Sequence, residues 1–287
     1  IMIIVKSLSE IRNKIIEIKS NHKKISLIPT MGNIHDGHLS LIRDAQNYDS
    51  IRIVTIFVNP LQFDNLNDLK NYPNTLEDDI TFLQKEKVDY LYIPTRDEIL
   101  SDIDNSKQLP WGFNNMLCGK MRTNHFNGVF AIVKKFFEII EPTYVFFGEK
   151  DYQQTILIKY IIENYFDKIK MIVCPTIRNS NQLALSSRNS RISKISLSET
   201  SAIIQALKKT CIDYYLTTGL KDFKKLYLLN DVCRTQYVEI HDERLLHQKH
   251  GIKKISDITN NRRIFIATYI ENIRLIDNQS LEEYDNL

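Results

Sequence analysis

The stretch from residue 25 to residue 45 constrains the fold most, because an apolar run passes directly into a glycine-containing turn and then into a helical pattern. The run Ile25–Ile28 is bounded by Pro29 and Gly32, which is typical of a short buried strand. After Gly37, apolar residues recur at helical spacing. The segment therefore predicts a strand, a loop and a helix in succession, which is the repeating unit of α/β proteins.

The loop in this unit has the composition of an anion-binding turn. Gly32 and Gly37 let the backbone approach a ligand closely, and the start of the next helix presents unpaired N–H groups to a phosphate. His35 and His38 fall on the same side of that helix start, where each offers a phosphoryl group a neutral donor or a cation. Zinc would need further ligands, and neither His22 nor the scattered cysteines have ligand spacing. We therefore expect a nucleotide here.

Strands and helices continue to alternate through the first 176 residues, which predicts a parallel sheet. We expect strands at 3–5, 51–58, 88–93, 144–147 and 169–173, and helices at 8–20, 75–87, 129–140 and 155–166. Ligands of such sheets bind beyond the carboxyl ends of the strands. The segments Asn59–Gln62 and Gly148–Gln154 both follow predicted strands, and Lys150 and Asp151 suit the phosphate and ribose of a nucleotide.

The pattern changes after Pro175, where we place a domain boundary that divides the chain into residues 1–176 and 177–287. The second part predicts a small α+β domain, with a helix from Ser196 or Ser198 to Tyr215 and strands at 237–240, 263–269 and 273–276. Before them, Ser186, Ser187 and Arg188 form a polar loop of the kind that holds phosphate oxygens.

Some features of the sequence have a purely local explanation, and others leave two interpretations open. Thr75 and Asp78 predict a variant capping box, so that Asp78 and Asp79 are first-turn helix charges rather than metal ligands. Residues 96–124 look irregular and hold Trp111, which is typical of a packed surface flap. Arg122 and His125 could serve an anion or could cap the following helix.

Composition excludes several classes of protein. The chain has 287 residues, of which 43% are hydrophobic and 25% charged, and its formal net charge is only +3 with no dense basic block, so we expect no nucleic-acid partner. The four cysteines lack Cys-x-x-Cys spacing, which predicts reduced thiols and a cytoplasmic location. The apolar run at the N-terminus is far too short for a signal or membrane segment.

Five separated stretches together resemble one family in the same order. The first contains the His-x-Gly-His signature of the nucleotidyltransferase superfamily, and its longer form Pro-Thr-Met-Gly-x-x-His-x-Gly-His resembles the pantoate–β-alanine ligases. The stretches are Met31–His38, Phe57–Phe63, Arg122–Gly128, Phe146–Gln154 and Leu185–Asn189, with further likeness at 237–242 and 274–278. The resemblance implies a Rossmann-like nucleotide domain with a C-terminal lid, a homodimer, and an ATP-dependent ligation of D-pantoate and β-alanine through pantoyl adenylate, releasing AMP and pyrophosphate.

The same resemblance assigns site residues. It implies catalytic roles for His38, His35 and Lys150, a magnesium ion to which no ligand residue is assigned, and pantoate contacts from Asn59, Gln62 and Gln154, with Gln62 also near β-alanine. The implied ATP contacts are Met31, Gly32, Asn33, Ile34, His35, Asp36, Gly37, His38, Gly148, Glu149, Lys150, Asp151, Ile177, Leu185, Ser186, Ser187 and Arg188.

The chain departs from the family pattern at a few positions, and two rival functions share part of the motif. Asn181-Gln182 stands where the family usually has an acidic residue and glycine, Leu185 replaces methionine, and Asn124 replaces glycine. These changes could alter loop geometry or lid mobility. A sibling nucleotidyltransferase would share the two-histidine motif but not both the 59–63 and 148–154 segments. A non-catalytic ATP-binding regulator would have no reason to keep both histidines and both glutamines.

Overall fold

The computed structural model describes residues 1–103, 109–221, 233–256 and 258–282. Its strands are β1 (Ile3–Val5), β2 (Ile25–Thr30), β3 (Ile51–Ile56), β4 (Tyr90–Tyr92), β5 (Tyr144–Gly148), β6 (Lys170–Cys174), β7 (Cys233–Asp242), β8 (Arg262–Ile270) and β9 (Ile273–Ser280). Its α-helices are α1 (Leu8–Ser20), α2 (Asp36–Ala45), α3 (Leu66–Lys70), α4 (Leu76–Lys85), α5 (Arg96–Leu100), α6 (Trp111–Asn115), α7 (Leu117–Met121), α8 (His125–Ile140), α9 (Tyr152–Tyr165), α10 (Lys194–Thr218) and α11 (Glu243–Lys249).

The first six strands form one parallel sheet in the order β1-β4-β3-β2-β5-β6. The predicted α/β class with a parallel sheet is therefore confirmed. The chain leaves β2 toward β3 on one side, whereas β5 pairs with β2 on the other side. Loops after β2 and β5 thus diverge at a topological switch point, which is where open α/β sheets bind ligands.

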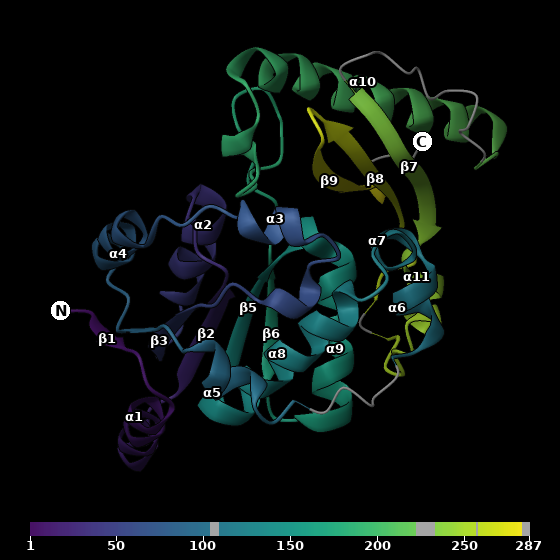
Figure 1. The fold of residues 1–287 in the computed structure, drawn as a ribbon. Coiled ribbons are helices and arrows are strands. Elements are labelled where there is room, and N and C mark those ends of the chain that lie inside the picture. Colours follow the sequence, from purple (N-terminus) through teal and green to yellow (C-terminus); the bar gives the residue numbers. More distant parts are fainter. Residues whose placement is uncertain (104–108, 222–232, 257, 283–287) are drawn as a thin grey trace.

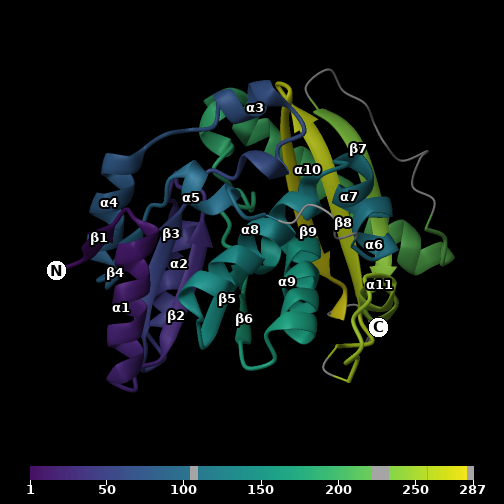
Figure 2. The same ribbon diagram turned by 60° about the horizontal axis from the view of Figure 1, so that its bottom comes forward.

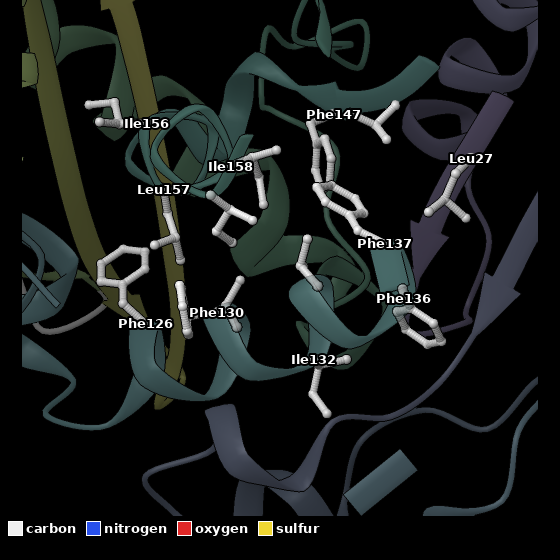
Figure 3. Close-up of a cluster of buried hydrophobic side chains, with 14 of the residues drawn as sticks. Leu27, Phe126, Phe130, Ile132, Phe136, Phe137, Phe147, Ile156, Leu157 and Ile158 are labelled. Atoms are coloured by element: carbon white, nitrogen blue, oxygen red, sulfur yellow. The ribbon is translucent and has the colours of Figure 1, made fainter. Parts of the chain in front are cut away.

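The main core lies between this sheet and helices α8 and α9. Eleven residues of α8 are buried, because the segment is apolar around most of its circumference. Figure 3 shows Phe136 and Phe137 of α8 near Leu27 of β2, and Phe126 of α8 beside Leu157 of α9. The helix ends at Ile140, where Glu141 adopts a left-handed conformation (φ 46°) directly before Pro142. This packing fixes the loop ends above the sheet.

A second sheet of three antiparallel strands, β7-β8-β9, contains the C-terminal strands. It packs with α10, and both lie at the opposite end of the molecule from α1 and β1 (Figures 1 and 2). The helix and strands of this part confirm the predicted small α+β class. The domain boundary at residue 176 and the role of this part as a lid stay predictions. Among the described helices, none has the length and apolar character needed to cross a bilayer.

Several local predictions were wrong. Residues 96–124 are not simply irregular, since they contain α5, α6 and α7, and the Trp111 side chain is 61% exposed rather than packed. The Thr75–Asp78 capping box does not form, because the Thr75 hydroxyl is instead 3.1 Å from Asp79 Oδ1. Helix α8 begins four residues earlier than predicted, and α11 was not predicted at all. Helices α5, α6, α7 and α11 have only five to seven residues each, so local apolar patterns carry little signal for them.

Candidate active site

A cavity of about 660 Å³ lies beyond the carboxyl ends of β2, β3 and β5, which is an ordinary size for a small-molecule site. It brings together most of the predicted residues from segments that are far apart in the chain. Those that line it are Met31, His35, Gly37, His38, Asn59, Gln62, Gly148, Lys150, Asp151, Gln154, Ile177, Leu185, Ser186, Ser187 and Arg188.

Five predicted ATP contacts do not line this cavity. Gly32 and Asn33 border a separate, smaller pocket behind the loop, and the side chain of Ile34 is buried in the core. Asp36 is exposed at the start of α2, and Glu149 points its carboxylate at Arg263 at 2.8 Å. The histidine-containing loop thus borders the cavity, but only some of its residues face it, and the assignment of these residues to ATP stays a prediction.

The two histidine rings stack against each other at the start of α2. Their centroids are 4.1 Å apart with an interplanar angle of 32°. The Nδ1 atom of His35 accepts a hydrogen bond from the backbone N–H of Gly37 at 3.1 Å, which places the proton of a neutral ring on Nε2. The Nδ1 atom of His38 is buried without a hydrogen-bond partner among the described residues. A buried polar atom of this kind is available to a ligand.

Electrostatics decide between the two protonation states that the sequence left open. Burial, followed by the charge of Lys150, lowers the pKa of His35 to about 4. Burial, then His35 and Lys150, holds the pKa of His38 well below its ordinary value. Both rings are therefore neutral at pH 7 and act as hydrogen-bonding groups, while Lys150 supplies the positive charge.

Asp79 supports the loop that carries His35 and His38, here called the histidine loop, and this role could not be predicted from the sequence. Its side chain is only 2% exposed. One carboxylate oxygen accepts from the backbone N–H of Asn33 at 2.9 Å, and the other accepts from that of Ile34 at 2.8 Å. Asn33 itself has a left-handed backbone (φ 51°), so the carboxylate compensates an otherwise unfavourable turn. Asp79 is a loop-positioning residue rather than a mere first-turn charge.

The loop after β3 is held close to helix α8. Asn59 donates from Nδ2 to Gln62 Oε1 and to the Gly128 carbonyl, both at 3.0 Å. Gln62 Nε2 lies 3.0 Å from Met31 Sδ, which joins this loop to the histidine loop. A Cβ atom at Gly128 would lie 2.4 Å from the Leu61 carbonyl carbon, so only glycine permits the approach. Gln62 is consequently presented from a rigid support.

Arg122 and His125 hold the carbonyl group of Gln62 in place. Arg122 Nη2 donates to that oxygen at 2.9 Å, and His125 Nδ1 lies 3.1 Å from it. Neither side chain caps α8, whose N-cap residue is Asn124 without a side-chain cap. Because both residues line the cavity, the helix-capping alternative is wrong.

The loop of Lys150 is bound by the C-terminal sheet. Asn278 on β9 donates from Nδ2 to the carbonyl oxygens of Glu149 at 3.0 Å and Lys150 at 2.9 Å. Arg263 on β8 pairs with Glu149 and with the buried Glu243 at 2.7 Å. The second sheet therefore fixes the backbone that carries Lys150.

Ser186, Ser187 and Arg188, here called the serine–arginine loop, form another wall of the cavity. Asn33 Nδ2 donates to the Ser187 carbonyl at 2.9 Å, and Ser187 Oγ donates to the Asn33 carbonyl at 3.3 Å. Arg188 pairs with Asp68 on α3 at 2.9 Å. Of the departures from the expected family pattern, Gln182 matters most, because it has a φ of 64° at the position where the resemblance implies glycine. A residue with a Cβ atom adopts this left-handed backbone conformation only at a cost in strain energy, and the exposed Gln182 side chain makes no buried contact that would offset it.

The fold and this cavity define an open α/β protein whose cavity, at the carboxyl ends of its parallel strands, brings two histidines and a lysine together with amide side chains. The sequence profile described as pantoate-beta-alanine ligase matches residues 3–280. A pantothenate synthetase of Buchnera aphidicola (strain Tuc7) is 38% identical, covering 98% of this chain and 99% of that relative. One from Francisella tularensis subsp. novicida is also 38% identical, over 96% and 94%. The chain belongs to the pantoate–β-alanine ligase family.

Solved structures agree with this membership. The ligase from Francisella tularensis, whose structure is a complex with β-γ ATP and β-alanine, has a TM-score of 0.79 and 34% identity, and the match covers 98% of each chain. The pantothenate synthetase from Thermus thermophilus has a TM-score of 0.80 and 27% identity, covering 98% of this chain and 99% of that one.

Proposed function

We propose that this chain joins D-pantoate to β-alanine with ATP in two steps. Pantoate's carboxylate first attacks the α-phosphorus of ATP, which forms pantoyl adenylate and releases pyrophosphate. The amine of β-alanine then attacks the acyl carbon, which forms pantothenate and releases AMP. The observation that carries this proposal is the meeting of His38, Lys150, Gln62 and Gln154 in one cavity of a chain from this ligase family.

The arrangement suits a reaction that needs positioning rather than a protein nucleophile. ATP would lie against the histidine loop, the Lys150 loop and the serine–arginine loop, with its α-phosphate near the histidine pair. Neutral His35 would donate from Nε2 to a phosphate oxygen as charge develops there, neutral His38 would donate from the ring nitrogen that carries its proton, and Lys150 would neutralise the same charge. A neutral imidazole donates in this way without leaving a buried cation after the product departs.

Pantoate would lie between the histidine loop and the amide pair. Gln62 and Gln154 both line the cavity, and neutral amides can bind a carboxylate or a hydroxyl without forming an ion pair that traps the intermediate. Asn59 would act through Gln62, since its Nδ2 already bonds both Gln62 Oε1 and the Gly128 carbonyl. Asn59 is only 2% exposed, which makes it a positioning residue rather than a direct contact.

Magnesium fits this site as an ion carried by the nucleotide. The described residues contain no group of three or more His, Cys, Asp and Glu side chains able to hold a metal ion. Asp151 lines the cavity with a 46% exposed carboxylate, and Mg²⁺ typically uses one or two carboxylates together with substrate phosphates. When bound, the ion would neutralise phosphate charge. The homodimer and the cytoplasmic location also remain predictions, from the family resemblance and from the cysteine pattern respectively.

Isotope exchange tests the proposal. With pantoate, ATP and magnesium but without β-alanine, the enzyme should incorporate labelled pyrophosphate into ATP, and with β-alanine it should form AMP rather than ADP. Gln62→Ala and Gln154→Ala should abolish both exchange and synthesis, because each residue acts before the amine arrives. Formation of ADP, or exchange that requires β-alanine, would contradict the two-step reaction. Exchange that survives in both glutamine variants would refute their assignment to pantoate.

A further inference from the structure

Asp68 on α3 is a carboxylate that pairs with two arginines of the cavity wall. Its Oδ2 atom accepts from Arg188 Nη2 at 2.9 Å, and its Oδ1 atom accepts from Arg191 Nη1 at 2.6 Å. All three residues line the cavity. Burial opposes ionisation of this carboxyl, but the charges and hydrogen bonds of the two arginines outweigh burial and lower the pKa of Asp68 below its ordinary value. The carboxylate is therefore an anion bound between two guanidiniums.

The two arginines belong to one turn of a 3₁₀-helix. Arg188 directly precedes the turn Asn189–Arg191, and the backbone N–H of Arg191 donates to the Arg188 carbonyl at 3.1 Å. Side chains three positions apart eclipse in such a turn, so both guanidiniums point to the same side. Two positive charges of the cavity wall thus share one carboxylate.

The arginines are fixed to the site more firmly than Asp68 is. Ser187, next to Arg188, exchanges two hydrogen bonds with Asn33 of the histidine loop. Helix α3, by contrast, buries none of its five residues, and its Leu66 is 74% exposed. An anion that enters between the two guanidiniums can therefore displace α3 with little loss of apolar burial.

We propose that Asp68 is an internal competitor of the terminal phosphates of ATP, and of pyrophosphate, for Arg188 and Arg191. This inference rests on the proposed function and adds a regulatory role for α3. A guanidinium fork binds phosphate oxygens with the same paired geometry as carboxylate oxygens, and a polyphosphate brings more charge to the same two arginines. Once pantoyl adenylate forms, pyrophosphate is no longer bonded to the nucleotide, and Asp68 competes with it for the arginines. The carboxylate thereby weakens the binding of ATP and favours the release of pyrophosphate.

Asp68→Asn tests the competition, because it removes the charge and keeps the size of the side chain. It should lower the dissociation constant of magnesium pyrophosphate, measured by calorimetry, by about 3- to 10-fold, since the ligand no longer has to displace a bound carboxylate. The KM for ATP should fall by a similar factor. Asp68→Glu, which keeps the charge, should stay closer to the wild-type enzyme than Asp68→Asn does.

Asp49→Asn is the matched control. It makes the same change in net charge at an exposed residue that precedes β3, at the amino-terminal edge of the parallel sheet and thus away from the cavity. It should leave the affinity for pyrophosphate and the KM for ATP unchanged.

Arg191→Gln separates competition at the arginine pair from a general effect of charge. In an Arg191→Gln background the carboxylate has only Arg188 to bind, so Asp68→Asn should change the pyrophosphate affinity by a clearly smaller factor than in the wild-type background. An equal factor in both backgrounds would show that Asp68 and Arg191 act independently, and it would overturn the proposal.

Two further results would overturn the proposal. Weaker binding of pyrophosphate by Asp68→Asn would mean that the carboxylate orients the arginines for phosphate, and unchanged binding would mean that it does not compete. Absence of pyrophosphate exchange in the wild-type enzyme would refute the two-step function instead. The calorimetric comparison does not depend on turnover, so the two failures can be told apart.

Discussion

The Oδ1 atom of Asp79 lies 2.8 Å from the backbone nitrogen of Ile34, and its other oxygen bonds the adjacent N–H group of Asn33. Removing this carboxylate would leave two N–H groups in a buried turn without partners. Asp79→Ala should lower the free energy of unfolding by about 3 kcal/mol and impair turnover. Urea unfolding and steady-state assays would measure both effects.

Its neighbour offers a matched control for this prediction. Asp78 is exposed in the same first turn of α4, so Asp78→Ala should cost only about 0.5 kcal/mol through loss of a helix-dipole interaction. Asp79→Asn keeps one accepting oxygen and should fall between the two. Equal stability of Asp79→Ala and Asp78→Ala would show that the turn does not depend on the carboxylate.

His38 should act mainly in the transition state. His38→Ala is expected to lower turnover by roughly 100-fold or more, the usual effect of losing one transition-state donor, with a smaller change in ATP affinity. Single-turnover kinetics and ATP titration would separate the two. His22→Ala removes an exposed histidine and should leave both unchanged. Near-normal turnover with weak ATP binding would make His38 a ground-state contact.

Stability should fall as the pH is lowered from about 6.5 toward 4. Burial lowers the pKa of His35 and His250 to about 4 and that of His247 to about 3, and the pKa values of His38 and His125 are also lowered. Below pH 6.5 the unfolded chain therefore binds protons that the folded chain does not, and each such histidine contributes a slope of about 1.4 kcal/mol per pH unit. Urea unfolding at a series of pH values would measure this slope.

A single substitution provides the control for that measurement. His250→Gln removes one buried histidine from the titration and should reduce the slope by about 1.4 kcal/mol per pH unit. A stability that is constant between pH 7 and pH 5 would show that the buried histidines are protonated in the folded state, contrary to the electrostatics of the site.

A glycine at residue 182 should stabilise the loop. Gln182 is exposed and has a φ of 64°, which costs a side chain roughly 1 kcal/mol that glycine avoids. Gln182→Gly should therefore raise the melting temperature by several degrees at most, while Asn181→Gly, whose φ is not positive, should lower it. Thermal unfolding of the two variants in parallel is sufficient, and destabilisation by Gln182→Gly would refute the strain.

Strongly periodic segments were predictable, whereas non-local bonding was not. The 8–20 helix was placed at its observed bounds, because its apolar period is a local signal. The role of Asp79 depends on a contact with Ile34 across 45 positions of sequence, and local patterns show only a helix start. The hydrogen bonds from Asn278 to the Lys150 loop could likewise not be predicted, because they depend on how the two sheets pack against each other.

The hydrogen bonds of Asn278 couple the position of Lys150 to the position of the C-terminal sheet. Because Asn278 bonds the carbonyls of both Glu149 and Lys150, any swing of the C-terminal sheet away from the cavity must either break these bonds or carry the loop with it. In the second case, opening would withdraw the ammonium group from the histidine pair, and closing would return it. Catalytic power would then switch on only when the cavity is shut, so that an ATP molecule in the open enzyme would be protected from wasteful hydrolysis.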